Sequence, residues 1–415
     1  MNKIAFIGLG KLGLPLACVL ASAGNKVLCV DKNEHTLSLL TEGQLPFHEP
    51  GLRPLMDQVG ENIVGYTDSY KTAVRDTDAA IILVNTQLGE DGYSSDFVEA
   101  AVSDIAINLK NLDKEYYTII LSSTVLPGTI NTKLIPLVEK ISNKKYGKDF
   151  GFSYVPDFVK LGCVINDFKN PEFFLIGSNH DKDHDITRDI FSGVHENSPP
   201  HYRLTLEETE VAKVALNAYV VSKITFANFL GRLCEGMENV NVHNVTEVIG
   251  NDRRISPHFF SSGAPYGGTC FPRDTWAFIK FAKDRDHEAK NLLFAEEVND
   301  IVYNYLLGRT HQHQKIGILG LSFKPNSPVT IGSPSAALVR DLLSADKTVY
   351  AYDPLDESYE NLGCPINRSE SAQECIDSSE VVILMHPDKS YKNLCYTQTE
   401  VVDVWGLTHG GDDND

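Results

Sequence analysis

The sequence has little positive charge, and this narrows what the protein can bind. Its 56 acidic residues outnumber the 37 basic ones, for a formal net charge of −19 at pH 7. Nucleic acids and anionic membranes repel a surface of that sign, because both are negatively charged. We therefore expect neither a nucleic-acid partner nor a membrane partner. A local basic pocket for a phosphate is still compatible with this charge.

Metal-type cysteine spacing and long apolar runs are also missing. The eight cysteines are scattered with no CxxC pair, so we predict no metal site. A strand predicted over residues 3–7 leaves no room for a secretory leader, and scattered thiols are typical of a reducing compartment. No apolar run approaches the roughly 20 residues that a bilayer-spanning helix needs. These absences predict a cytoplasmic location.

Alternating strands and helices make up most of what is present. A length of 415 residues fits two or three domains. In the first half, strands are predicted over residues 3–7, 27–30, 78–84, 117–122 and 152–155, with helical patterns between them. Such alternation predicts an α/β fold with a doubly wound parallel sheet. A smaller α/β unit follows, with strands predicted over residues 315–319, 348–352, 381–385 and 400–404.

A glycine-rich turn follows the first strand and precedes an apolar helix. The second strand ends in Asp31. The order along this unit of about 30 residues is therefore strand, GxGxxG turn, helix, strand and acidic residue. This order predicts a dinucleotide site, because the glycines let a pyrophosphate reach the helix N-terminus. Asp31 would bond ribose hydroxyls and repel a 2′-phosphate, so NAD is favoured over NADP. The predicted cofactor loop consists of Gly8, Gly10, Lys11, Leu12 and Gly13.

Three polar residues stand where predicted strands end. They are Thr86, Thr124 and Asp157. Ligands of doubly wound sheets bind at the carboxyl ends of the strands, so each residue is a candidate for the site. Helix capping or turn chemistry would explain each of them as well.

A cysteine lies in the stretch 263–274, which reads GAPYGGTCFPRD. Gly267 and Gly268 precede Cys270, and glycines allow a tight turn and the close approach of a substrate. Asp274 is near enough to orient or deprotonate a group beside the sulfur. A buried structural cysteine followed by a turn is the alternative.

One long helix is predicted over residues 206–238. A helix of that length either spans two domains or forms a dimer interface. Lys213 and Asn217 are four residues apart and share a face, where they could meet a sugar or an oxyanion. A solvated helix face is the alternative. In the last unit Gly317 and Gly320 do not complete a GxGxxG, so we expect a nucleotide other than NAD there.

Two nucleotide-type domains joined by a long helix, with a cysteine turn after it, resemble the nucleotide-sugar 6-dehydrogenases. The resemblance covers nearly the whole chain in the family's order. It rests on residues 8–17, 46–52, 123–129, 213 and 217, 252–255, 270–274 and 322–326. It implies an NAD-binding Rossmann domain (residues 1–200), a central dimerisation domain with the cysteine loop (201–300), and a smaller Rossmann-like domain for the UDP-sugar (312–415). It also implies a homodimer formed through the central helix.

The resemblance further implies a four-electron oxidation of the sugar C6 alcohol to a carboxylate, with two NAD per sugar. Cys270 would be the nucleophile, passing through a thiohemiacetal and a thioester. Lys213 and Asn217 would stabilise the oxyanion, Asp274 would assist proton transfer, and Thr124 would help to place a water. Thr86 and Thr124 would join the cofactor loop and Asp31 at the NAD. The implied substrate-binding residues are Phe158, Val159, Lys160, Lys213, Asn217, Arg254, Tyr266, Gly267, Phe323 and Lys324.

The sequence departs from the family pattern at several positions. Leu161 replaces a glutamate that the family uses in the water-dependent step. Asp157 replaces a second glutamate of the family, and its side chain is one methylene shorter. We expect hydrolysis of the thioester to rely on Asp157, Thr124 and Asp274. Ile331 and Trp405 stand where the family has arginines. Lys11 takes a position that is often aromatic, and Pro265 replaces a glycine.

These departures leave more than one function open. The leading interpretation is oxidation of UDP-glucose to UDP-glucuronate. A UDP-N-acetylhexosamine is the alternative substrate, because subfamilies acting on such sugars also lack the carboxylate at Leu161. A catalytically idle protein that binds nucleotide sugar or NAD as a scaffold is a third interpretation. A two-electron hydroxyacid dehydrogenase of related fold would not need the cysteine.

Overall fold

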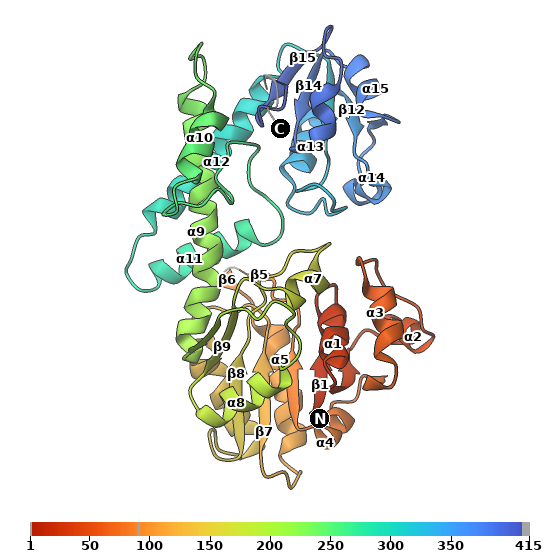
Figure 1. The fold of residues 1–415 in the computed structure, drawn as a ribbon, viewed down its shortest axis with the longest axis vertical. Helices are drawn as coiled ribbons and strands as arrows, with labels where there is room; N and C mark the ends of the chain where they lie inside the picture. Colours follow the sequence, from red (N-terminus) through yellow and green to blue (C-terminus); the bar gives the residue numbers. More distant parts are fainter. Residues whose placement is uncertain (1, 90–91, 409–415) are drawn as a thin grey trace. The chain divides into compact units, whose positions relative to one another are not determined.

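The computed structural model describes residues 2–89 and 92–408, which form two compact units. The division falls within α9 (Leu206–Leu233), between Ala215 and Leu216. Each unit contains a sheet with helices on both faces (Figure 1). Most of the predicted central segment (residues 216–300) and the predicted last segment belong to one unit in this division. The three-domain division itself stays a prediction.

The first unit is built on a sheet in which the described residues form eight strands, ordered β10-β9-β8-β7-β4-β1-β2-β3. The strands are β1 (Lys3–Ile7), β2 (Lys26–Val30), β3 (Ile63–Thr67), β4 (Ala79–Ile82), β7 (Tyr117–Leu121), β8 (Phe150–Tyr154), β9 (Phe174–Ser178) and β10 (His201–Leu204). The strand order reverses at β1, with β2 on one side and β4 on the other. A doubly wound sheet offers its ligand crevice at such a reversal.

The sheet is parallel, as predicted, except at one edge. β9 pairs with β8 antiparallel, and β10 then runs parallel to β9. Sequence patterns did not indicate β3, β9 or β10. Of these, β3 and β10 are edge strands, which escape such patterns because they bury fewer apolar residues: β10 is mostly exposed.

Apolar helices cover both faces of this sheet and bury its central strands on both sides. One core joins β1 to α4 (Tyr70–Asp76), α5 (Asp96–Leu109) and α6 (Ile135–Ser142) through Ala5 and Ile7. The other joins β1 to α1 (Gly13–Ser22) and α3 (Leu52–Val59) through Ile4 and Phe6. The helices and short elements of this unit are α1 (Gly13–Ser22), α2 (Glu34–Thr41), α3 (Leu52–Val59), η1 (Gly60–Asn62), α4 (Tyr70–Asp76), β5 (Leu88–Gly89), β6 (Gly92–Tyr93), α5 (Asp96–Leu109), η2 (Ile130–Leu134), α6 (Ile135–Ser142), α7 (Val164–Lys169) and α8 (Asp181–Ile190).

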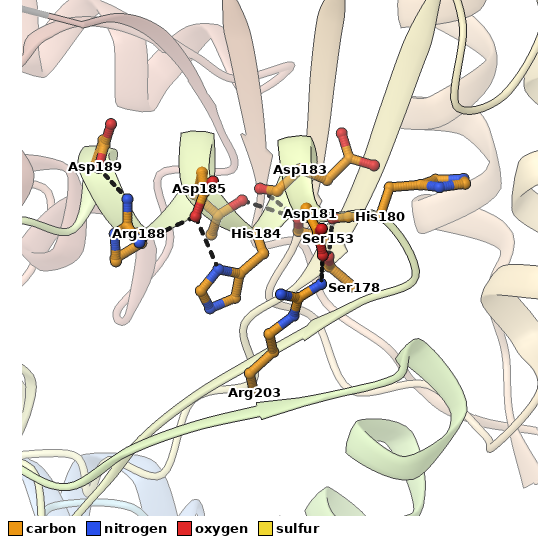
Figure 2. A network of polar contacts seen from close by, with 11 residues as sticks. Ser153, Ser178, His180, Asp181, Asp183, His184, Asp185, Arg188, Asp189 and Arg203 are labelled. Atoms are coloured by element: carbon orange, nitrogen blue, oxygen red, sulfur yellow. Dashed lines mark hydrogen bonds and ion pairs between the residues drawn. The ribbon is translucent and has the colours of Figure 1, made fainter.

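A polar network fastens α8 to the sheet (Figure 2). Asp183 has no exposed surface, and it accepts a hydrogen bond from the Tyr116 hydroxyl at 2.7 Å. Burial raises the pKa of this carboxyl. Thr187 donates to the Ser153 hydroxyl of β8 at 2.9 Å, and Arg203 of β10 pairs with Asp181. The network therefore holds the antiparallel edge that the sequence did not predict.

Helix α9 is shorter than the predicted residues 206–238. It ends at Leu233, and Gly236 then adopts a φ of 78°, in the left-handed region where helices stop. Contrary to the sequence analysis, α9 is long and apolar enough to cross a membrane, with a mean hydropathy of 1.2 over 18 residues. Core helices pass the same test. The buried Glu210 and Lys213 of α9 are bonded within the protein, as in a core helix.

The second unit contains a smaller sheet, in which the described strands are all parallel and ordered β13-β12-β11-β14-β15. The strands are β11 (Lys315–Leu319), β12 (Thr348–Tyr352), β13 (Asn367–Arg368), β14 (Val381–Leu384) and β15 (Glu400–Asp403). The remaining elements are α10 (Val242–Gly250), α11 (Phe271–Lys283), α12 (Lys290–Gly308), α13 (Pro334–Ser344), α14 (Asp356–Leu362), α15 (Ala372–Asp377) and η3 (Lys389–Asn393). Two core clusters, one packed on α13 and the other on α15, cover the sheet.

Candidate active site

The glycines of the turn after β1 have three different roles. Gly8 has a φ of 99°, and a Cβ on it would lie 2.2 Å from the Leu83 carbonyl oxygen. A Cβ on Gly13 would lie 1.9 Å from the Gly8 oxygen, so this glycine lets α1 pack on the turn. Around Gly10, no heavy atom of the described residues beyond its two chain neighbours lies within 4 Å of such a Cβ. Gly10 therefore marks the open side of the turn.

The start of α1 suits a phosphate group. Its N-cap residue, Leu12, has no side chain that could bond the first N–H groups. Free N–H groups and the helix dipole favour an anion at such an end. Lys11 is exposed beside it. Together with the opening at Gly10, these residues fit the pyrophosphate of a dinucleotide.

Asp31 follows β2 and is tied to the same turn. Its Oδ2 accepts the N–H of Leu9 at 2.6 Å, and its Oδ1 accepts the N–H of Asn33 at 2.8 Å. The carboxylate is thereby held at the carboxyl edge of the sheet. Its partly exposed position leaves it open to a ribose hydroxyl.

An added methyl group should affect stability differently at Gly13 and at Gly10. Gly13→Ala should lower the free energy of unfolding by at least about 2 kcal/mol, because a backbone oxygen cannot yield to the new Cβ. Gly10→Ala should leave that energy within about 0.5 kcal/mol of the parent and still weaken NAD binding. Urea unfolding and NAD titration measure the two effects. Equal stability of the two variants would contradict this account of the turn.

Thr86, Thr124 and Asp157 follow three neighbouring strands, β4, β7 and β8. These strands are parallel and end in register, Ile82 beside Leu121 and Leu121 beside Tyr154. The three residues therefore lie at one edge, the same edge as the cofactor turn. Both threonines are at least nine-tenths buried. Neither begins a helix, since the next helices start at Asp96 and Ile130, so helix capping does not explain them.

Lys213 of α9 lies against the loop after β8. Its ammonium donates to the Asp157 carbonyl, lies 3.1 Å from the Asp157 Oδ1, and stands 4.8 Å from the centre of the Phe158 ring. Lys213 is buried and Asp157 is nearly so. Val159 is half-buried and Lys160 is exposed in the same loop. The structure thus brings together Lys213, Asp157 and Phe158, which are far apart in the sequence.

Two buried glutamates that we did not predict hold the loops of this edge. Glu49 accepts the N–H groups of Gly162 and Val164 at 3.1 and 2.8 Å, after the Asp157 loop. Glu210 accepts those of Gly128 and Ile130 at 2.6 and 2.9 Å, after the Thr124 loop. Burial raises the pKa of Glu210 to about 7, although the two N–H donors oppose this rise. Glu49 lies in residues 46–52, a segment that contributed to the family resemblance but not to the predicted site. Glu210 lies one helical turn before Lys213 on α9.

The second unit carries the cysteine loop. Cys270 is exposed and is the N-cap residue of α11. A Cβ on Gly267 would lie 2.4 Å from the Gly332 oxygen, and one on Gly268 would lie 2.6 Å from the Phe323 ring. The two glycines therefore let this loop pack closely against the loop after β11, and the thiol stays accessible rather than buried.

Asp274 and Asn217 meet behind the cysteine, in the same unit. Asn217 donates to the Asp274 Oδ2 at 2.5 Å, and Arg273 donates to the Oδ1 at 3.2 Å. Only 1% of Asp274 is exposed. The Asp274 carboxylate is therefore fixed one helical turn after Cys270. The backbone N–H of Asp274 also donates to the Cys270 carbonyl at 2.7 Å.

The other predicted substrate residues of this unit lie in different surroundings. Lys324 is partly buried next to Phe323, and Arg254 is exposed and pairs with Asp252. Tyr266 is 7% exposed, and its ring packs against Val221 and Ala295. Its backbone, rather than its ring, is therefore the part close to the cysteine turn.

Trp405 takes part in packing at the start of the cysteine loop. A Cβ on Gly263 would lie 2.1 Å from its ring. Its indole N–H is buried and has no hydrogen-bond partner among the described residues. The large ring thus fills space beside the loop where the family has an arginine. Ile331, at the other replaced arginine, is 72% exposed.

The turn after β11 copies the first turn only in part. Asp353, after β12, accepts the N–H of Leu321 at 2.8 Å, as Asp31 accepts that of Leu9. Ser322 stands where the first turn has Gly10, and a Cβ on Gly320 would lie 2.4 Å from the His386 ring. Asp353 is buried and also bonds Ser358. This turn lacks the opening that suits a pyrophosphate in the first unit.

The sequence matches three domains of one family. Residues 2–195 match the NAD binding domain of the UDP-glucose/GDP-mannose dehydrogenase family, residues 207–301 its central domain, and residues 317–408 its UDP binding domain. The chain belongs to this family. It is therefore an NAD-dependent nucleotide-sugar 6-dehydrogenase, which confirms the predicted fold class, family and cofactor.

Similar proteins within the family act on different sugars. The chain is 32% identical to the UDP-glucose 6-dehydrogenase of Rhizobium meliloti over 391 residues, covering 90% of this chain and 87% of that protein. It is 30% identical to the GDP-mannose 6-dehydrogenase of Pseudomonas aeruginosa over 411 residues, covering 94% and 93%. Its structure matches that of a UDP-glucose dehydrogenase from Pyrobaculum islandicum with a TM-score of 0.89 and 28% identity, over 98% of this chain and 95% of that one. The sugar itself does not follow from the family.

Proposed function

We propose that the chain oxidises the C6 alcohol of a UDP-hexose, UDP-glucose first of all, to the carboxylate. The observation that carries the proposal is an accessible Cys270 at the start of α11, with the buried Asp274 and its partner Asn217 behind it. A plain alcohol dehydrogenase needs no such thiol. The similarity to the UDP-glucose 6-dehydrogenase of Rhizobium meliloti supports the choice of sugar.

NAD bound at the turn of Gly8, Gly10 and Gly13 supplies a hydride acceptor for each of the two oxidations. Gly10 admits the pyrophosphate, the first N–H groups of α1 bond it, and Asp31 binds the ribose. Thr86 and Thr124 complete the wall of the crevice at the ends of β4 and β7. Lys11 and Leu12 line the same turn.

Cys270 acts between the two oxidations. Its thiolate sulfur adds to the C6 aldehyde carbon, and the carbonyl electron pair moves to the oxygen, giving a thiohemiacetal. Lys213 and Asn217 stabilise the oxyanion, since ammonium and amide donors are suited to that charge. The second oxidation leaves a thioester on Cys270. The N-terminus of α11 favours negative charge on the sulfur when it acts as nucleophile and when it leaves.

Water completes the reaction by attacking the thioester carbon. The C–S bond breaks, the sulfur leaves as thiolate, and the acid is released after loss of the water proton. Leu161 cannot accept that proton, so Asp157 takes it, with Thr124 placing the water and Asp274 assisting near the sulfur. The Lys213 ammonium, 3.1 Å from the Asp157 Oδ1, holds this carboxylate in place at the end of β8.

Each unit carries loops that are proposed to bind substrate. In the first unit, Phe158, Val159 and Lys160 would contact the sugar. In the second unit, Lys324 and Phe323 would meet the nucleotide sugar, with Tyr266 and Gly267 contributing backbone groups. Arg254 would reach the substrate of a second subunit in a homodimer. Exposed apolar side chains on α9 support such an interface, namely Tyr219, Phe226 and Leu233.

The yield of NADH per sugar tests the proposal. Limiting UDP-glucose should give two NADH per molecule, whereas a hydroxyacid-type dehydrogenase would give one. UDP-N-acetylglucosamine and GDP-mannose serve as competing substrates, and a higher kcat/KM for either would change the assigned sugar. NADH from none of them would favour the idle scaffold.

Light scattering on the same preparation tests the dimer, for which we expect twice the chain mass.

A further inference from the structure

The segment before Cys270 has no regular secondary structure of its own. It lies between α10 and α11. Residues 263–266 and Gly268 are buried, Gly267 is partly buried, and residues 269 and 270 are exposed. Buried backbone N–H and C=O groups must find partners, because leaving them unpaired costs free energy. The partners of this segment therefore determine where the thiol is held.

Two asparagine side chains bond this backbone. Asn228 of α9 accepts the Gly263 N–H at 2.8 Å and donates to the Ala264 carbonyl at 3.4 Å. Asn299 of α12 accepts the Tyr266 N–H at 2.8 Å and donates to the carbonyl of the same residue at 3.1 Å. A primary amide carries both an acceptor and a donor, so it can pair with a backbone N–H and a backbone C=O as a neighbouring strand would.

Tyr266 is fixed by its side chain as well. Its hydroxyl donates to Glu296, which precedes Asn299 by three residues on α12. Burial and this carboxylate raise the pKa of Tyr266, which keeps the hydroxyl protonated as a donor. Helix α12 thus holds one residue at its N–H, its carbonyl and its hydroxyl, four positions before Cys270.

The loop is held again just before the cysteine. Gly268 donates its N–H to the Gly332 carbonyl at 2.9 Å, and α11 begins directly after Cys270. Between Tyr266 and α11 the backbone therefore has little freedom. A rotation at Tyr266 would be transmitted to the sulfur.

We propose that Asn299 is a positioning residue that holds the Cys270 thiol in its reactive orientation through the backbone of Tyr266. The inference rests on the proposed function, in which Cys270 is the nucleophile. Displacement of a nucleophile by about 1 Å can cost about a hundredfold in rate. Loss of the amide should therefore affect the chemical step more than substrate binding.

Asn299→Ala tests this inference, with Asn304→Ala as the matched control. Asn304 lies on the same helix and is exposed. In Asn299→Ala we expect kcat with UDP-glucose and NAD to fall by about tenfold or more, with both KM values within about threefold of the parent. Alkylation of Cys270 by iodoacetamide, followed by peptide mass spectrometry, should slow severalfold, because the sulfur leaves the N-terminus of α11. Asn304→Ala should match the parent in all three.

Each result bears on the proposal. Parental kcat and alkylation rate in Asn299→Ala would overturn it, and so would a rise in KM with unchanged kcat. If Asn299→Ala does not fold, Asn299→Asp keeps an acceptor for the Tyr266 N–H and removes the donor to the Tyr266 carbonyl, and an unchanged alkylation rate there would overturn the proposal. Full activity in Cys270→Ser would refute the proposed function instead. The alkylation contrast between the Asn299 and Asn304 variants is independent of that outcome.

Discussion

Replacement of Cys270 by serine should abolish sustained NADH production from UDP-glucose, with a fall in kcat of at least about a thousandfold. A serine hydroxyl at the same place is a far weaker nucleophile toward the aldehyde than a thiolate. The first oxidation does not need the sulfur, so each enzyme molecule can still release one hydride. Stopped-flow absorbance of NADH should therefore show at most one NADH per subunit, followed by a nearly flat line.

Cys395→Ser is the control for this substitution. Cys395 is also exposed in the second unit, and hydrogen bonds from Thr397 lower its pKa, so it is a second thiol expected to react readily. Its replacement should leave kcat unchanged. If Cys270→Ser kept more than about a tenth of the parental kcat, the thioester route would be wrong.

Asp157→Asn should stall the enzyme after the second oxidation. The asparagine keeps nearly the same shape and can still accept from Lys213, but it cannot take a proton from water. We expect a burst of two NADH per subunit and then a steady rate lowered about a hundredfold. Intact-protein mass spectrometry should detect the sugar acid bound to Cys270 as a thioester.

Asp167→Asn is the matched control, because Asp167 lies on the neighbouring α7 and accepts the Lys160 N–H at 2.9 Å. It should show no burst and nearly the parental rate. A steady rate in Asp157→Asn equal to that of the control would mean that another group accepts the proton, and the expected role of Asp157 would be wrong.

The sequence predicted those parts of the site that depend on neighbouring residues. The cofactor turn followed from glycines within a few positions of one another, and the structure gives each of them a separate steric reason. The strands with continuous apolar runs, β11 and β12, have the bounds that were predicted. The antiparallel edge at β9 was missed because its pairing depends on a partner strand and on the network around Asp183.

Local patterns could not indicate which groups bond one another across the fold. Glu49 and Gly162 are 113 positions apart, and Glu210 and Gly128 are 82 apart. Both glutamates look like ordinary charged residues in the sequence. Only the structure shows that they are buried, and buried carboxylates are almost always paired or hydrogen-bonded.

By itself, the sequence determined the NAD-binding turn, the cysteine on a glycine turn, and the family, because these depend on residue types at short and fixed spacing. Tertiary structure decided the rest. It paired Lys213 with Asp157 across 56 positions and Asn217 with Asp274 across 57. It also fixed the Cys270 loop to α12 through Asn299. Such contacts arise only when separate elements pack together, since the packing removes water from polar groups and leaves them to bond each other.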